Sequence, residues 1–173
     1  HAGPVMIPEA TLKKYHATVV AFKKGEVVFE QGDNATQFLI VRSGKIKMRT
    51  YNEDGREFVQ GYFLEGQSFG EPPFFNHLPY PATAVAVTDS EVWKCPYDKF
   101  IKLLRDNFAI HLNVTQVLSG RLIYKSIMLT EIAVEEAEHR LTTLINYFRQ
   151  SHGQVEIGKS FRVPFTRQQL ADM

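Results

Sequence analysis

The sequence has a single cysteine, no long apolar run and almost no net charge. Cys95 has no partner for an internal disulfide and no second thiolate for a zinc or iron–sulfur site, so we expect it to be a small buried apolar residue. No apolar run approaches the roughly 20 residues of a membrane-spanning helix, and the stretch from His1 to Pro4 lacks the basic and apolar regions of a secretory signal. These absences predict a cytoplasmic protein with no membrane association.

Residue patterns typical of enzymes are also missing. The six histidines are scattered without a paired spacing that would suit a metal. No nucleophile elbow, phosphate-binding P-loop or dinucleotide-binding fingerprint is found. The sequence therefore predicts neither an enzyme nor a protein with a metal or other cofactor.

The charge is unevenly distributed along the 173 residues, although the formal net charge is only +1. Residues 139–173 hold five Lys/Arg against two Asp/Glu, a net of +3, which leaves 15 against 17, a net of −2, for residues 1–138. A basic segment at one end points to contact with phosphate groups.

Residues 17–96 have the pattern of a β-rich domain. Short apolar stretches alternate with turn signals such as Lys24-Gly25, Ser43-Gly44 and Glu65-Gly66. In the stretch from Lys45 to Tyr51, a strand would turn Ile46 and Met48 inward and the basic residues to water. About eight such strands favour a closed sandwich or jelly roll. Its core would come from 27–29, 38–41 and 82–87.

The following residues have a helical pattern. A short helix is predicted over 98–105, and residues 107–150 contain no proline and one glycine, Gly120. Apolar residues fall on more than one side of this long helix, so we expect it to be covered on two sides. One cover is the β domain. The other is the helix of a second copy, in which case Leu118 and Met128 lie in the contact, or the interior of a larger monomer. A break near residues 135–136 is predicted from clustered glutamates.

The last segment, 151–173, is predicted to form a loop, a short strand over 161–165 and the beginning of a helix. Thr166 and Gln169 have the spacing of a capping box. A helix of seven or so residues after that cap is too short to be stable alone, so we expect the natural protein to continue beyond Met173.

Three consecutive segments resemble the β-roll of the Crp/Fnr transcription regulators. They are Gly25–Asp33, Phe38–Ile46 and Gly66–Glu71. The resemblance implies an α+β protein: an N-terminal β-roll (a double-stranded β-helix or jelly roll) over 1–106, a dimerisation helix over 107–134, and part of a winged helix-turn-helix over 135–173.

The resemblance also implies a ligand site in the β-roll. Gly70 and Glu71 match the pair that holds the ribose of a cyclic nucleotide. The phosphate-binding arginine and serine of the family fall at Tyr80 and Pro81, followed by Ala82. A tyrosine carries no positive charge and a proline has no backbone N–H. We therefore predict that cyclic AMP binds weakly or not at all, and that the ligand, if there is one, is less anionic.

Further along the chain, the resemblance places polar residues of the long helix beside the ligand. They are Lys125 and Ser126, and Lys125 could supply the missing positive charge.

The function implied is that of a DNA-binding regulator that acts as a homodimer. Thr166, Arg167 and Gln168 match the start of the first motif helix, which faces the DNA backbone. The base-reading helix would lie beyond Met173. RNA polymerase is a candidate partner for the loop 151–158. The alternative is a cyclic-nucleotide or small-molecule sensor domain that regulates another protein.

Overall fold

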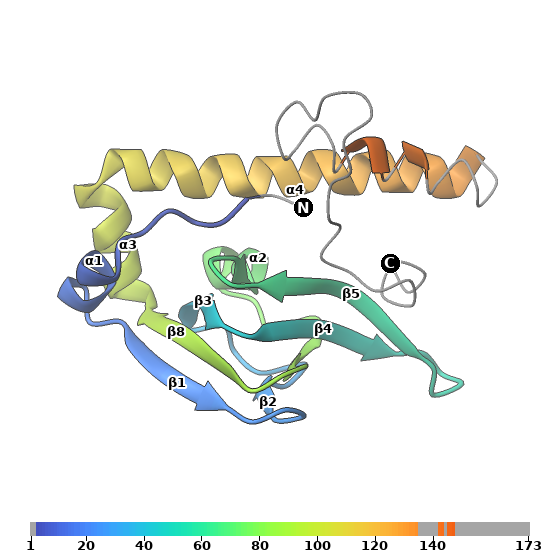
Figure 1. Cartoon of the computed structure of the whole chain (residues 1–173), viewed down its shortest axis with the longest axis horizontal. Helices are drawn as coiled ribbons and strands as arrows, with labels where there is room; N and C mark the ends of the chain where they lie inside the picture. Colours follow the sequence, from blue (N-terminus) through green and yellow to red (C-terminus); the bar gives the residue numbers. More distant parts are fainter. Residues whose placement is uncertain (1–2, 135–141, 144, 148–173) are drawn as a thin grey trace, which may run out of the picture.

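The structure is a computed structural model, and it describes residues 3–134, 142–143 and 145–147. Eight strands in this part of the chain form two four-stranded antiparallel sheets, with strand orders β1-β8-β3-β6 and β2-β7-β4-β5 (Figure 1). The bounds are β1 Thr18–Phe22, β2 Val27–Phe29, β3 Gln37–Ser43, β4 Lys45–Tyr51, β5 Glu57–Leu64, β6 Ser68–Phe69, β7 Thr83–Ala86 and β8 Ser90–Pro96. The predicted β-roll is confirmed.

Helices follow and flank the β-roll. Their bounds are α1 Glu9–Lys14, α2 Glu71–Asn76, α3 Tyr97–Asp106 and α4 Phe108–Val134. The sequence predicts α3 and the beginning of α4 to within one residue, but neither α1 nor α2. The predicted break near 135–136 lies outside the described residues. No helix in the described ranges is long and apolar enough to cross a membrane.

The short helix α2 replaces a loop that the two adjacent prolines lead one to expect. Pro72 and Pro73 fall in its first turn, where a backbone N–H has no helical partner and proline is tolerated. Gly70 precedes the helix with φ 72° and His77 ends it with φ 54°. Both values lie in the left-handed region, which turns the chain sharply at each end of the helix.

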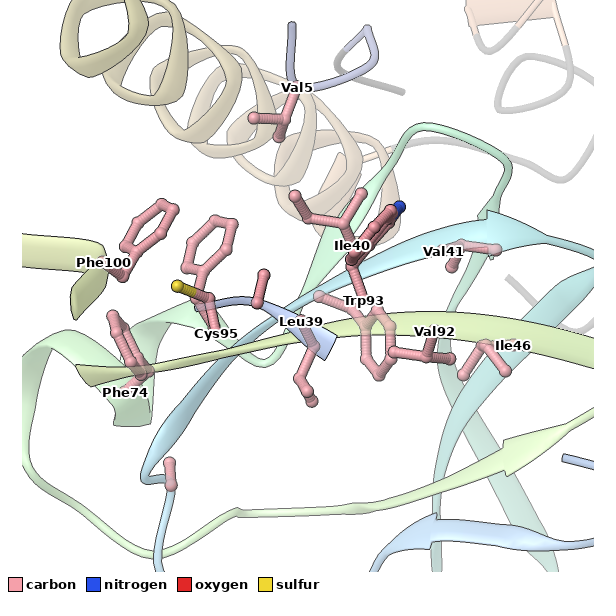
Figure 2. Close-up of a cluster of buried hydrophobic side chains, with 14 of the residues drawn as sticks. Val5, Leu39, Ile40, Val41, Ile46, Phe74, Val92, Trp93, Cys95 and Phe100 are labelled. Atoms are coloured by element: carbon pink, nitrogen blue, oxygen red, sulfur yellow. The ribbon is translucent and has the colours of Figure 1, made fainter. Parts of the chain in front are cut away.

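The core lies inside the β-roll and extends under α2 and α3. Figure 2 shows Phe74 and Phe100 at one end of the buried cluster and Ile46 at the other. The rings of Phe38 and Phe100 stack with centroids 3.8 Å apart, which joins β3 to α3. Cys95 is buried among these side chains, as predicted, and burial raises the pKa of its thiol to about 11.

Alternation in β4 follows the predicted pattern. Ile46 and Met48 are buried. Lys47 and Arg49 lie on the other face of the strand, where both pair with Glu57 of β5, at 2.5 and 3.4 Å. These two cations therefore face solvent, as predicted, and also form ion pairs with the neighbouring strand.

The long helix α4 runs over the β-roll (Figure 1). Apolar residues lie on both its buried and its exposed side. Val114 and Val117 are buried against the β-roll. Leu118 is half-buried and packs against the same core, and its place in a contact between helices stays a prediction. The exposed apolar residues on α4 are Phe108, Leu112, Leu122, Ile123, Leu129 and Ile132.

Gly44 connects β3 to β4 at a crowded point, which a pair of matched variants can test. Its φ is +86°, and a Cβ there would lie 2.6 Å from the carbonyl oxygen of Asp89. Gly25 has φ +87° with nothing within 4 Å. We expect Gly44→Ala to lower the free energy of unfolding by about 2–3 kcal/mol and Gly25→Ala by about 1 kcal/mol, because only the first adds a clash to the strained φ. Urea denaturation measures both; equal losses would contradict the close approach.

Candidate ligand-binding cavity

A cavity of about 630 Å³ lies between the β-roll and α4. This size is within the range of small-molecule sites in proteins. Strands β4 and β5, helix α2, the end of α3 and the middle of α4 contribute side chains to it. Most of its wall is apolar, with contributions from Met48, Phe63, Phe75, Leu104, Val114 and Leu118.

A buried ion pair joins the two sides of this cavity. Glu71, the first residue of α2, is only 2% exposed. Its Oε1 accepts a hydrogen bond from Nη1 of Arg121 on α4 at 2.5 Å, and the Ser68 hydroxyl also donates to it. Nη2 of Arg121 donates to the Ser68 carbonyl oxygen at 2.5 Å. The guanidinium also lies over the Phe63 ring, 5.3 Å from its centroid.

The Glu71 carboxylate and the Arg121 guanidinium are thus paired with each other. The carboxylate that the family resemblance assigns to a ribose hydroxyl is already accepting two hydrogen bonds, one of them charge-assisted. The planar guanidinium bonds to two acceptors at once, which a lysine ammonium could not do with the same geometry. The ion pair fixes α4 against β6 and α2 at one point.

Arg121 is not among the predicted site residues, although the sequence contains a signal for it. Arg121 and Lys125 are the only Lys, Arg, Asp or Glu between residues 107 and 130. No acidic residue stands three or four positions from Arg121, so no partner is available within its own helix. A cation in an apolar helix without a local partner points to a carboxylate elsewhere in the fold, here 50 residues away.

The predicted ligand residues of the β-roll are divided between the cavity and the core. Gly70, Glu71 and Pro81 line the cavity. Ala82 is fully buried and Tyr80 is 5% exposed.

The position of Tyr80 is set by ring packing. Its ring stacks on Phe29 with centroids 3.5 Å apart, and a Cβ on Gly70 would lie 2.9 Å from it. Burial raises the pKa of Tyr80 to about 12, and the charges of Asp33 and Glu71 act in the same direction. The phenol is therefore neutral at pH 7 and brings no positive charge for a phosphate.

The predicted residues on α4 also separate. Lys125 lines the cavity and is exposed at its edge. Ser126 is exposed and does not line it; its carbonyl oxygen accepts a hydrogen bond from Thr130 at 3.1 Å. Within the described part of the chain no group of three His, Cys, Asp or Glu is placed to hold a metal ion. The predicted DNA-contacting residues Thr166, Arg167 and Gln168 lie outside the described residues.

Comparison with known proteins identifies the family. The model of the cyclic nucleotide-binding domain matches residues 19–107. The fumarate and nitrate reduction regulatory protein of Yersinia pestis is 29% identical over 148 residues, 84% of this chain and 58% of that protein. The chain therefore belongs to the cyclic nucleotide-binding domain family, and within it to the Crp/Fnr group. It spans about three fifths of the length of the curated relatives it matches.

Solved structures agree with this assignment. The catabolite activator protein of Thermus thermophilus is 25% identical with a TM-score of 0.64, over 72% of this chain and 58% of that one. The c-di-GMP responsive global regulator CLP of Xanthomonas campestris has a TM-score of 0.71 over 96% of this chain and 84% of that one. At 21% identity, the second comparison supports the fold alone, which is a β-roll followed by a long helix.

Removal of one partner of the Glu71–Arg121 pair tests how much the pair stabilises the fold. We expect Arg121→Met to lower the free energy of unfolding by about 2–4 kcal/mol, because Glu71 stays buried without its counter-ion. The double variant Glu71→Gln/Arg121→Met should lose less than the sum of the two single variants.

Arg42→Met is the matched control. It removes an arginine whose ion pairs with Glu9 and Glu91, both at 3.0 Å, are far more exposed, and it should cost about 0–1 kcal/mol. Urea denaturation of the parent, the two single variants, the double variant and Arg42→Met measures these losses. Similar losses for Arg121→Met and Arg42→Met would show that the cavity pair is no stronger than a surface pair.

Proposed function

We propose that this protein is a DNA-binding transcription regulator of the Crp/Fnr type, with an effector-sensing β-roll that lacks the phosphate-binding arginine. The observation that carries the proposal is the Glu71–Arg121 pair, which spans the cavity and holds α4 to the β-roll. A molecule in the cavity contacts both sides of this connection. The contents of the cavity can therefore bias the position of α4. The proposal includes a cytoplasmic location, no catalytic activity and no resident cofactor.

A second copy of the chain is the proposed partner of α4. Leu122 and Leu129 are 67% and 68% exposed and lie one heptad apart on the helix. Ser119 and Ser126 complete a seam with alternating spacings of three and four residues. Small residues between leucines let two helices approach closely. In this proposal Ser126 belongs to the helix seam rather than to the cavity wall.

A charge placed in this seam tests dimerisation. We expect Leu122→Lys to convert a dimer into a monomer, because paired helices would bury an uncompensated lysine. Leu78→Lys is the control, since Leu78 is 56% exposed, follows α2 and is not one of the seam residues. Light scattering at tens of micromolar, an order-of-magnitude choice set by mass action, gives the mass of each protein. A monomeric parent would contradict the proposed dimer.

DNA is the proposed second partner, through the basic residues 139–173. Thr166, Arg167 and Gln168 have the residue types that contact phosphates at a helix N-terminus. The loop 151–158 stays a candidate contact for RNA polymerase. Contacts of this kind position a protein on DNA without reading its sequence.

Titration of labelled duplexes at two salt concentrations tests the DNA contact. We expect the chain to bind without sequence preference and more weakly at higher salt, because phosphate contacts release counterions. Arg167→Gln should weaken binding to all duplexes and reduce the salt slope by about one. Lys13→Gln, an exposed change on α1, should leave both unchanged. Absence of DNA binding by a dimeric chain would favour a sensor that regulates another protein.

A further inference from the structure

The charges at the cavity do not cancel. Glu71 and Arg121 neutralise each other within the ion pair. The other lysine, arginine or acidic residue of the lining is Lys125, which has no ion pair among the described residues. With histidine counted as neutral, the lining carries a formal charge of +1, and this charge belongs to Lys125.

The charged residues of α4 lie toward one end of the cavity. His111, Val114, Leu118, Arg121 and Lys125 follow one another at spacings of three and four residues, so they share one face of the helix, and all five line the cavity. Val114 to Lys125 spans about 16 Å by the helical rise. The end near the α3–α4 junction (Figure 1) has the apolar Leu104 and Val114 beside the uncharged polar Thr115 and His111, and none of its lining residues is Lys, Arg, Asp or Glu. Lys125 is the last of the five residues and lies at the other end.

From this distribution we infer that the cavity binds an amphipathic monoanion: a carboxylic acid with an apolar chain or ring. Its apolar part lies along the wall formed by Phe63, Leu118 and Val114, and its carboxylate pairs with Lys125. Such a ligand gains from apolar burial along most of its length and places its single charge beside the single uncompensated cation. The inference deepens the proposed effector-sensing function, on which it rests, by naming the ligand class.

The same groups disfavour a cyclic nucleotide. A ribose hydroxyl would have to share the Glu71 carboxylate with Arg121 and Ser68, which both donate to its Oε1. The cyclic phosphate needs a cation in the β-roll, where Tyr80 is neutral and stacked in the core. A purine and a sugar would also place polar atoms against the apolar wall of the cavity, where they would have no hydrogen-bond partners.

Calorimetric titration of the dimeric chain with decanoate tests the inference, with decanol as the uncharged ligand of the same length and cyclic AMP as the nucleotide. We expect one decanoate per chain, weaker binding of decanol, and no saturable binding of cyclic AMP. Lys125→Gln should weaken decanoate about tenfold, the low end for a lost charged hydrogen bond because the lysine is exposed. It should leave decanol unchanged.

Two further variants separate binding from folding. Lys13→Gln, an exposed lysine outside the lining, should bind decanoate like the parent. Leu118→Trp fills the cavity and should abolish decanoate binding, while circular dichroism shows that the chain is folded.

Three results would overturn the inference. They are equal affinities for decanoate and decanol, unchanged decanoate affinity in Lys125→Gln, or cyclic AMP binding tighter than decanoate. If decanoate does not bind to a dimer that still binds DNA, the inferred ligand class is wrong, whereas the proposed function as a transcription regulator is kept. Loss of dimer formation and of DNA binding by the parent would instead remove the proposed function.

Discussion

The ion pair between Glu71 and Arg121 is the contact through which the β-roll and the long helix depend on each other. A carboxylate that is 2% exposed is stable only with a partner, and that partner comes from a helix 50 residues further along the chain. The pair therefore fixes the helix at one point and defines one wall of the cavity. Because Glu71 and Arg121 both line the cavity, the bond that holds the helix also shapes the space open to a ligand.

Local patterns in the sequence predicted the parts of the fold that local forces determine. Strand alternation in β4 placed Ile46 and Met48 in the core because a strand turns successive side chains to opposite faces. The absence of proline over residues 107–150 indicated the long helix. Helix α2 was missed because Pro72 and Pro73 argue against a helix interior, whereas the structure uses them in a first turn, after a left-handed glycine.

The cavity could be predicted only in part, because it depends on contacts between distant residues. Gly70, Glu71, Pro81 and Lys125 were named from the family resemblance, and they do lie around one cavity. Which way each residue faces was not available from the sequence. Tyr80 neighbours Pro81 yet points into a ring stack. Leu118 lies four residues from Leu122 yet packs on the β-roll, while Leu122 is 67% exposed and lies at the edge of the cavity.

The stacked tyrosine constrains how this protein could change over evolution. Replacing Tyr80 with arginine would supply a cation at the position used by the family. It would also remove a ring that fills the space between Phe29 and Gly70, and a flexible, charged chain cannot replace that packing without a cavity or a buried charge. A single substitution at Tyr80 therefore gains the cation and loses the packing together, and a second change that refills the space beside Phe29 and Gly70 would separate the two effects.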